Sequence, residues 1–314
     1  MPPSETTLIS IVTPCYNEEG NVEELLARID AVFTGLPAYT FELIAVENGS
    51  FDGTWDRLSA MAVRDERVKV VRLSRNFGAD GGITAGLEYA RGAAAVLMTA
   101  DLQDPPEVIP AFVEKWEQGF QNVYGIVTKR VGVSAVRRMN SQLFYWLMNK
   151  LTGGVFPRNV SDFRLVDRRV YETINGMNER NRFLRGMFFW SGFRSTGVEH
   201  ERPPRFAGES KAGTMAMISL ALRSILSFSY FPLRLITILG LTISALSIPM
   251  LLYIVVRVLM GVYVTPGFGT IMAVMLLMFG FLFTMLGVVA EYVGLIYDEV
   301  KQRPNFIVSE TIGL

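Results

Sequence analysis

Residues 8–128 alternate between short apolar runs and segments whose apolar residues recur at helical spacing. The apolar runs predict buried strands, and the apolar stripes between them predict helices. We expect strands at 8–13, 41–46, 68–73, 93–98 and 122–128, and helices at 21–33, 54–64, 81–90 and 110–119. Repeated strand–helix alternation is typical of an α/β fold with a mostly parallel sheet flanked by helices.

Further along the chain the pattern changes to two long apolar stretches. Residues 235–256 and 267–290 contain no Asp, Glu, Lys or Arg. Because a helix rises ~1.5 Å per residue, either stretch is long enough to cross the ~30 Å hydrocarbon core of a bilayer. The sequence therefore predicts a transmembrane hairpin of two helices, at about 235–258 and 267–291.

Basic residues flank this hairpin on one side. Arg223 and Arg234 precede it and Lys301 and Arg303 follow it, whereas the connecting segment 257–266 holds a single arginine. By the positive-inside rule both termini lie in the cytoplasm, and the chain is a multi-pass protein of the cytoplasmic membrane.

The composition shift also predicts the domain organisation. We expect a cytoplasmic α/β domain at 1–212, an amphipathic interfacial helix at 213–233, the two membrane helices within 234–298 and a cytoplasmic tail at 299–314. A further helix at 134–151 carries basic and aromatic residues, which fits a membrane surface or an ordinary core-facing position. Small residues along the spans permit close helix packing, so we expect a homo-oligomer.

Composition excludes several classes of protein. The 314 residues include 30 basic and 30 acidic side chains, so net charge gives no sign of a nucleic-acid partner. Cys15 is the only cysteine, which rules out an intrachain disulfide and a zinc–thiolate cluster. His200 is the only histidine, which argues against a Ser-His-Asp hydrolase or a site of several histidines. Half of the residues are hydrophobic and mean hydropathy is +0.29, as expected for a membrane protein.

Candidate chemistry begins where the strand at 93–98 ends, in the sequence T-A-D-L-Q-D-P-P-E. This arrangement delivers Asp101 and Gln103 to the carboxyl end of a buried strand, where open α/β sheets build ligand sites. Oxygen ligands of this kind suit Mg²⁺ or Mn²⁺, which shares its coordination shell with substrate phosphates. The alternative is a polar turn without a ligand.

Two more polar clusters follow neighbouring strands, at Thr13–Glu19 and Val46–Thr54. They should converge with Asp101 on one crevice. There Tyr16 can stack on a base, and Glu18 and Glu47 can accept hydrogen bonds from a base or a ribose. The chain has neither a Walker A sequence nor G-x-G-x-x-G, so this nucleotide site is of another type.

Several motifs, taken together, resemble the family 2 glycosyltransferases. They are P-C-Y-N-E, E-N-G-S-F-D-G-T, S-R-N-F-G, A-D-L-Q-D-P-P-E, S-D-F-R-L and G-E-S-K. More narrowly, the chain resembles the polyprenyl-phosphate sugar transferases, a group that includes dolichyl-phosphate mannose synthase. The two apolar C-terminal stretches and the closing Y-D-E-V-K-Q-R-P resemble its bactoprenol glucosyltransferase branch. The likeness covers nearly the whole chain.

This resemblance implies a GT-A (Rossmann-like) fold that binds a nucleotide diphosphate sugar, expected to be a UDP-sugar, together with Mg²⁺ or Mn²⁺. It implies nucleotide contacts from Pro14, Tyr16, Glu18, Glu47 and Arg205. It implies metal ligation by Asp101 and Gln103, and catalytic roles for Asp101, Asp162 and Lys211. It implies that the lipid phosphate is held by Arg130, Arg137 and Ser141.

The chain departs from the family pattern at two places. Relatives usually carry Asp-Asp where this chain has Glu47-Asn48, and D-A-D where it has Thr99-Ala100-Asp101. The first change keeps one carboxylate, whereas the second removes one beside the expected metal. Both departures bear on the identity of the sugar.

The implied reaction is an inverting transfer to a membrane polyprenyl phosphate, giving a polyprenyl-phosphate sugar for cell-envelope glycan. A phosphate monoester is already ionised near neutral pH, so the reaction needs no strong general base. The metal and Lys211 would stabilise the leaving diphosphate, and Asp162 would orient a phosphate or sugar. Alternatively, Asp162 forms a structural ion pair with Arg164 or a neighbour.

Two other functions are open to this sequence. One is a processive polysaccharide synthase, although the chain has no Q-x-x-R-W motif. The other is a membrane-tethered sugar-nucleotide sensor whose turnover was impaired when the carboxylate at position 99 was lost. If the hairpin positions the site, deleting 235–314 should abolish transfer to long-chain lipid and leave nucleotide binding measurable.

Overall fold

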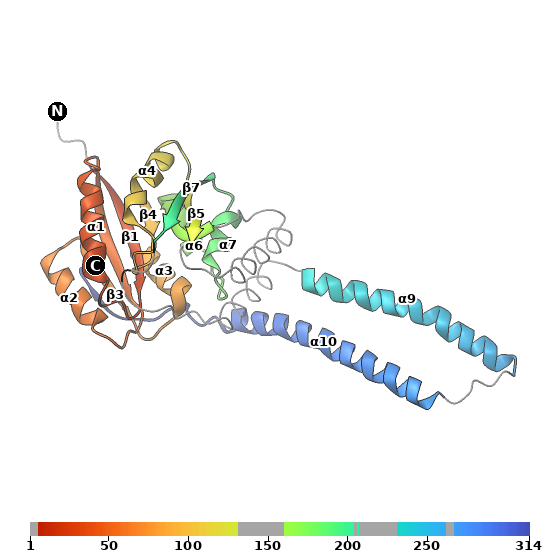
Figure 1. The fold of residues 1–314 in the computed structure, drawn as a ribbon. Helices are drawn as coiled ribbons and strands as arrows, with labels where there is room; N and C mark the ends of the chain where they lie inside the picture. Colours follow the sequence, from red (N-terminus) through yellow and green to blue (C-terminus); the bar gives the residue numbers. More distant parts are fainter. Residues whose placement is uncertain (1–5, 131–159, 204–205, 207–230, 262–266) are drawn as a thin grey trace. The chain divides into compact units, whose positions relative to one another are not determined.

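The computed structural model of the chain describes residues 6–130, 160–203, 206, 231–261 and 267–314. The chain forms two compact units, each described separately below (Figure 1). The first unit comprises residues 1–221 and 303–314, and the second comprises residues 222–302.

The first unit is an α/β structure, as the sequence predicts. Its strands are β1 (Thr7–Cys15), β2 (Tyr39–Glu47), β3 (Val68–Leu73), β4 (Ala94–Leu97), β5 (Asn122–Arg130), β6 (Val160–Asp167), β7 (Ser195–Arg202) and β8 (Val308–Ile312). Its helices are α1 (Val22–Thr34), α2 (Thr54–Arg64), α3 (Gly78–Tyr89), the short 3₁₀ helix η1 (Pro106–Val108), α4 (Ile109–Glu117), α6 (Arg168–Asn175) and α7 (Leu184–Trp190). The strands and helices predicted for residues 8–128 are confirmed, with boundaries shifted by a few residues.

The strands form one sheet in the order β7-β5-β6-β4-β1-β2-β3-β8. Strand β1 pairs in parallel with β2 and β4, and β2 pairs in parallel with β3. Strand β6 runs antiparallel to β4 and β5, and β8 runs antiparallel to β3. The prediction of a mostly parallel sheet is therefore confirmed, with β6 and β8 as the reversed strands.

Helices cover both faces of this sheet because its central strands are apolar on both sides. On one face Ile9, Ile11 and Leu43 belong to a core cluster that also contains the buried sides of α1, α2 and α4. On the other face α3 approaches the sheet so closely that a Cβ added at Gly86 would lie 2.4 Å from Val12 Cγ1. A glycine is required there, because any side chain would push α3 off the sheet.

The edge strand β8 lies in the segment 299–314, which the sequence analysis predicts only as a tail. Its residues pair with β3, with Val70 opposite Ile312 and Arg72 opposite Glu310. The Ser309 hydroxyl donates to the Arg72 carbonyl at 3.1 Å, and Ile312 packs against the core cluster. The first unit is thus completed by residues that follow the long apolar helices.

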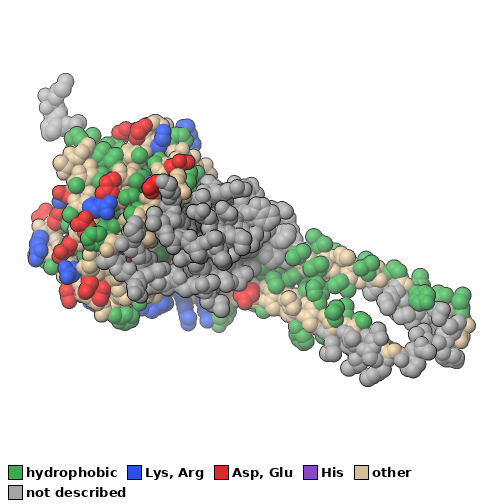
Figure 2. All heavy atoms as spheres, in the orientation of Figure 1, with side chains coloured by type: hydrophobic (Ala, Val, Ile, Leu, Met, Phe, Trp, Pro, Cys, Tyr) green, Lys and Arg blue, Asp and Glu red, His purple; other side chains and the backbone are tan. Residues whose placement is uncertain are grey.

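The second unit consists of two long helices that contact each other, α9 (Phe231–Leu259) and α10 (Phe268–Lys301). Their 29 and 34 residues correspond to about 43 and 51 Å of helix. Figure 2 shows mainly hydrophobic side chains along these helices, whereas charged side chains gather on the α/β unit. Within the described residues, Leu277–Lys301 is the one helical stretch long and apolar enough to cross a membrane, with mean hydropathy 1.9 and none of it buried.

Candidate active site

The candidate site lies at one edge of the sheet, where polar loops follow several strands. The parallel strands β1, β2 and β4 all end at this edge, so the loops after Cys15, Glu47 and Leu97 meet there. Strand β6 runs the opposite way, with Arg164 opposite Leu97, so β6 begins at this same edge. The topology therefore brings Asp162 to the loops that the sequence singled out, although it lies on a separate strand.

The loops after β1 and β2 are tied together by hydrogen bonds. The Asn17 backbone N–H donates to the Ser50 hydroxyl at 3.0 Å, and the Phe51 N–H donates to Asn17 Oδ1 at 2.9 Å. The Glu18 N–H donates to the Thr54 hydroxyl at 2.8 Å, at the start of α2. Asn17 has φ of 54°, a left-handed conformation that asparagine tolerates better than most residues. The two loops thus form one rigid wall.

Three of the predicted nucleotide-binding residues lie on or beside this wall. Tyr16 meets the ring of Phe51 edge to face, with ring centroids 6.4 Å apart. Pro14 lies against α3, where a Cβ added at Gly82 would lie 2.8 Å from Pro14 Cβ. The Glu18 carboxylate accepts a hydrogen bond from the Asn21 side chain at 2.5 Å. The wall therefore offers an aromatic surface beside a carboxylate.

The fourth predicted residue, Glu47, faces inward. It is 1% exposed, and its carboxylate accepts a hydrogen bond from the Ser50 backbone N–H. Its other oxygen lies 3.3 Å from Arg72 Nε, and the Arg72 guanidinium stacks on Trp55 at 4.4 Å. In this arrangement Glu47 fixes the turn that carries Ser50 and Phe51.

Asn48, the first departure from the family pattern, uses both ends of its amide. Its Nδ2 donates to the Gly78 carbonyl at 2.9 Å, and its Oδ1 accepts from the Phe77 N–H at 2.9 Å. An ionised aspartate has no donor for the Gly78 carbonyl. Asn48 therefore anchors the start of α3 in a way that a carboxylate would not reproduce.

Thr99, the second departure, lies between two carboxylates. Its hydroxyl is 2.7 Å from Asp101 Oδ1 and 2.9 Å from Asp104 Oδ2. Asp101 Oδ1 also accepts the Gln103 backbone N–H at 3.2 Å, and Asp104 Oδ1 lies 3.4 Å from Arg202 Nη2. Thr99 thus links the predicted metal ligand Asp101 to a second buried aspartate, Asp104.

Asp104 is 1% exposed and its environment disfavours ionisation. Burial raises the pKa of Asp104, and the charges of Asp101 and Asp162 also raise it, whereas Arg202 and the Thr99 hydroxyl lower it. The net direction is upward. The Thr99 hydroxyl has a single proton, so it can donate to only one of the two carboxyl groups at a time.

The turn that carries Asp101 and Gln103 is strained. Leu102 between them has φ of 59°, and its side chain is buried in the core cluster. A left-handed conformation is unfavourable for leucine and persists only where surrounding contacts enforce it. Packing of Leu102 therefore fixes the direction of its two polar neighbours.

Asp162 forms a two-pronged ion pair with Arg185 on α7. Arg185 Nε donates to Asp162 Oδ1 at 2.9 Å, and Arg185 Nη2 donates to Asp162 Oδ2 at 2.6 Å. Burial would raise the pKa of Asp162, but the charge and hydrogen bonds of Arg185, with the charges of Arg164 and Arg202, lower it to about 2. Asp162 is thus a permanently ionised carboxylate at this edge.

A buried arginine lies directly under Asp162. Arg164 is 1% exposed and donates to the Ser161 carbonyl at 3.2 Å and to the Asp162 carbonyl at 3.3 Å. Its guanidinium lies 4.6 Å from the centroid of the Phe188 ring. Burial lowers the pKa of Arg164 to about 10, which still leaves it charged at neutral pH. Arg164 therefore holds the backbone of the strand end rather than the Asp162 carboxylate.

The remaining predicted site residues belong mostly to segments that the structure does not describe. Arg137, Ser141, Arg205 and Lys211 lie outside the described residues, as do the predicted helix at 134–151 and most of the predicted interfacial helix. Arg130 ends β5 opposite Arg202, with its side chain outside the described part.

A divalent metal fits the residues at this edge when substrate supplies part of its shell. The described part of the chain contains no group of three or more His, Cys, Asp or Glu side chains placed to hold an ion. Mg²⁺ and Mn²⁺ at phosphate-transfer sites, however, need only one or two carboxylates beside substrate phosphates and water. Asp101 and the neighbouring Gln103 provide such a partial set.

The structure adds three residues that sequence reasoning missed. Phe51 is 89% exposed beside Tyr16, Asp104 joins Asp101 through Thr99, and Arg185 pairs with Asp162. Phe51 and Asp104 stand inside motifs that the sequence already offered. Arg185 lies in none of the motifs, and its pairing with Asp162 depends on the fold, which brings α7 beside the start of β6.

Comparisons with known proteins identify the family of the chain and several relatives. A model of the family described as glycosyl transferase family 2 matches residues 10–174. An uncharacterized glycosyltransferase of Synechocystis sp. is 41% identical over 310 residues, which is 98% of this chain and 97% of that protein. A prophage-derived bactoprenol glucosyl transferase of Shigella flexneri is 36% identical over 303 residues, which is 96% of this chain and 98% of that protein.

Among solved structures, the fold is similar to that of glucosyl-3-phosphoglycerate synthase from Mycobacterium tuberculosis, solved with Mn²⁺, uridine diphosphate and glucosyl-3-phosphoglycerate. The TM-score is 0.50 with 20% sequence identity, and the match covers 71% of this chain and 80% of the synthase. The similarity concerns the fold, and it agrees with the α/β architecture of the GT-A type.

Proposed function

Because the chain belongs to glycosyl transferase family 2, we propose that it transfers a sugar from a nucleotide diphosphate sugar to a membrane polyprenyl phosphate. The observation that carries this proposal is the similarity to a bactoprenol glucosyl transferase over 96% of the chain, which includes the long apolar helices as well as the α/β unit. The product, a polyprenyl-phosphate sugar, would serve cell-envelope glycan or glycoconjugate modification.

The donor, proposed to be a UDP-sugar, binds at the wall formed by the loops after β1 and β2. Tyr16 and Phe51 provide a surface on which a base can stack, and Glu18 accepts hydrogen bonds from the base or ribose. Asp101 and Gln103 would hold Mg²⁺ or Mn²⁺, which when bound neutralises charge on the diphosphate. Arg205 and Lys211 would add positive charge from a segment outside the described residues.

The acceptor phosphate attacks the anomeric carbon and the nucleoside diphosphate leaves from the opposite face, so the anomeric configuration inverts. The phosphate is mostly ionised at neutral pH and needs no base to activate it. Asp162 is held ionised by Arg185, which suits a role in orienting a sugar hydroxyl or a phosphate-bound cation rather than in taking up a proton. Positioning and charge stabilisation then supply most of the catalysis.

The acceptor side of the proposal requires a membrane. We propose that α9 and α10 both span the bilayer, α9 through its charge-free residues 235–256 and α10 through its charge-free residues 268–290. The positive-inside rule then places the α/β unit in the cytoplasm. Arg130, Arg137 and Ser141 would hold the lipid phosphate, and the predicted interfacial helix would lie at headgroup level.

A donor panel tests this proposal. The full chain in detergent is incubated with different nucleotide sugars and Mn²⁺, with and without polyprenyl phosphate, and release of nucleoside diphosphate is measured. Release that depends on the lipid is the expected result and identifies the sugar. Donor binding without release under all conditions would instead indicate a sugar-nucleotide sensor, and release of polymer would indicate a processive synthase.

A further inference from the structure

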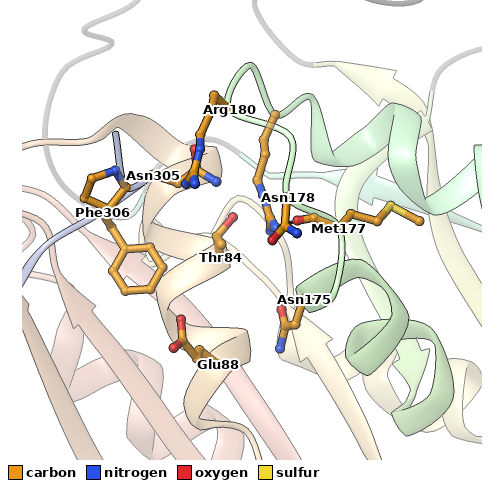
Figure 3. A pocket seen from close by; sticks show the side chains of 10 residues that line it. Thr84, Glu88, Asn175, Met177, Asn178, Arg180, Asn305 and Phe306 are labelled. Carbon is orange, nitrogen blue, oxygen red and sulfur yellow. Dashed lines mark hydrogen bonds between the residues drawn. The ribbon is translucent and has the colours of Figure 1, made fainter. Parts of the chain in front are cut away.

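A cavity of about 500 Å³ lies in the α/β unit, lined by α3, the end of α6, the loop between α6 and α7, and the segment that follows α10. The loops after β1, β2 and β4 contribute nothing to its described lining. Its volume is typical of pockets that hold small molecules. Figure 3 shows Thr84 and Glu88 on α3, Asn178 from the loop and Phe306 from the segment after α10 arranged around one space. The proposed sugar transfer uses none of these residues.

Two polar side chains of the lining are exposed and available to a ligand, the Glu88 carboxylate and the Asn178 amide. Within the part of the chain that the structure describes, neither side chain forms a hydrogen bond or an ion pair. A carboxylate only accepts hydrogen bonds, whereas an amide both accepts and donates. The available groups are therefore mainly acceptors.

Two further oxygens of the lining are acceptors because their own groups donate to the protein. The Thr84 hydroxyl gives its single proton to the Asp80 carbonyl at 2.7 Å. Asn305 Nδ2 donates to the Glu179 carbonyl at 3.0 Å. Hydroxyl and amide oxygens keep their lone pairs when their protons are used in this way. The lining therefore favours a ligand that carries several O–H donors.

The charges of the lining favour a neutral ligand. Arg182 donates to backbone carbonyls, to two through Nη2 and to a third through Nε, and Arg180 also interacts with other groups of the protein. A phosphate would bring its oxygens against the Glu88 carboxylate and the other acceptor oxygens. A cation would meet the positive charges of both guanidiniums. Neither sign of charge fits this lining.

Phe306 and Met177 add apolar surface to the cavity. A pyranose ring has an apolar C–H face that packs on an aromatic ring, and hydroxyls at its edge that donate to acceptors. A ring without hydroxyls would leave the acceptors of the lining unpaired. A neutral sugar ring combines the properties that the lining requires.

We propose that this cavity is a second sugar site, which binds a neutral hexopyranoside. Glu88, Asn178 and Thr84 accept hydrogen bonds from its hydroxyls, and Phe306 packs on the face of its ring. The inference does not rest on the proposed sugar transfer, because none of these residues belongs to the expected donor, metal or lipid-phosphate sites.

Ligand titration followed by saturation-transfer NMR tests the proposal. The full chain, in a detergent without a sugar headgroup, is titrated separately with methyl α-D-glucopyranoside, glucose 1-phosphate and glucosamine. UDP and Mn²⁺ are present in excess to fill the expected nucleotide site. We expect the neutral glucoside to bind about fivefold more tightly than either charged sugar. Tighter binding of a charged sugar, or no binding of the glucoside, contradicts the proposal.

Three variants assign the binding to this cavity. Glu88→Ala should weaken binding of the glucoside about tenfold, because a charged acceptor is lost, and Asn178→Ala about fivefold. Phe306→Leu should weaken it about fivefold through loss of the aromatic face. Glu172→Ala, at an exposed glutamate on α6 outside the cavity, is the matched control and should bind as the wild type does.

A fourth variant separates this site from the candidate active site. Asp101→Asn should weaken binding of UDP with Mn²⁺ and leave binding of the glucoside unchanged. If Asp101→Asn weakens the glucoside as much as Glu88→Ala does, the glucoside occupies the donor site and the proposal is wrong. Glucoside binding that Glu88→Ala and Asn178→Ala leave unchanged also overturns it, and both of these exposed positions are informative even if Phe306→Leu disturbs the fold. Because UDP binding is measured in the same samples, failure of the donor site is seen separately.

Discussion

At the scale of single residues, the candidate site consists of side chains held in pairs. The Thr99 hydroxyl lies within hydrogen-bond distance of both Asp101 and Asp104. Asp162 forms an ion pair with Arg185, and Glu47 forms one with Arg72. Each pair leaves the functional group little freedom of rotation. Such restraint is what a reaction without a strong general base requires, since positioning and charge then provide the rate enhancement.

Replacing Thr99 by valine tests the first of these pairs. Thr99→Val keeps the shape and removes the hydroxyl that contacts Asp101 and Asp104, which leaves each of these buried carboxyl groups with one hydrogen bond fewer. We expect a loss of about 1–3 kcal/mol in unfolding free energy and weaker Mn²⁺-dependent donor binding. Denaturant titration and donor binding measure the two effects. Thr173→Val, at an exposed threonine on α6, should change neither, and equal behaviour of both variants would contradict the pairing.

Replacing Arg185 by glutamine tests the second pair through pH. In the wild type the pKa of Asp162 is about 2, so this carboxylate stays ionised well below neutral pH. Arg185→Gln removes the positive charge that does most to lower this pKa, so the pKa of Asp162 should rise toward the ordinary range of an aspartate. The acid limb of kcat/KM should move to higher pH in the variant. Arg185→Lys should restore part of the wild-type profile, and an acid limb that stays in place would show that Asp162 is dispensable.

The Asp162–Arg185 ion pair also makes the stability of the fold depend on pH. Because the folded-state pKa of Asp162 is lowered, the stabilisation from its ion pair is fully present above the ordinary pKa of an aspartate. It is lost as the pH falls from about 4 toward about 2. The Arg185→Gln variant should show a smaller loss of stability over this acid range than the wild type.

At the scale of elements, local pattern predicted the first half of the chain well. Strands such as Phe41–Val46 and helices such as Thr54–Arg64 have a single periodicity and clear turn residues at their ends. Because parallel strands end at one edge, this pattern also predicted that Tyr16, Glu18 and Asp101 follow strands ending at the same edge, and the sheet topology agrees. Those parts of the site were accessible to sequence reasoning.

Strand β6 and the C-terminal strand β8 were not predicted as strands, for physical reasons. Strand β6 contains Asp162 and Arg164, and a fully buried arginine breaks the apolar pattern by which buried strands are recognised. Strand β8 is short and mostly exposed, and it pairs with a strand some 237 residues earlier in the chain. Contacts between residues far apart in the sequence produce no local periodicity from which they could be predicted. The Asp162–Arg185 ion pair could not be predicted for the same reason.

Truncation after Ile307 tests the contribution of β8. Without β8 the edge of β3 is exposed, and Arg72 loses Glu310 at 3.8 Å and the Ser309 hydroxyl. Because Arg72 also holds Glu47, we expect lower stability of the α/β unit and a higher KM for the donor. Glu310→Gln leaves the strand in place and removes an exposed ion pair, which should cost less than about 1 kcal/mol. A truncated chain with unchanged donor KM would show that β8 does not support the nucleotide loop.

At the scale of the whole molecule, the α/β unit is formed by two segments of the chain, one before the apolar helices and one after them. Residues 303–314 belong to the first unit although the second unit, residues 222–302, separates them from the rest of it. Deleting 235–314 would therefore remove β8 together with the helices. The sequence-based expectation that such a deletion leaves nucleotide binding measurable was made without this strand, because residues 299–314 were predicted only as a tail.

A more selective deletion separates anchoring from folding. A chain in which a Gly/Ser linker replaces residues 231–301 keeps β8 for pairing with β3 and removes only the apolar helices and their connection. We expect this variant to bind the donor with near wild-type affinity and to lose transfer to long-chain polyprenyl phosphate in vesicles, because the site is no longer held at the lipid headgroups. Transfer to a short, soluble prenyl phosphate should persist.

A chain that ends at residue 234 lacks β8 and should bind the donor more weakly than the linked variant. If both bind equally, β8 is a passive edge strand, and if the linked variant still modifies long-chain lipid, α9 and α10 are not needed to position the site.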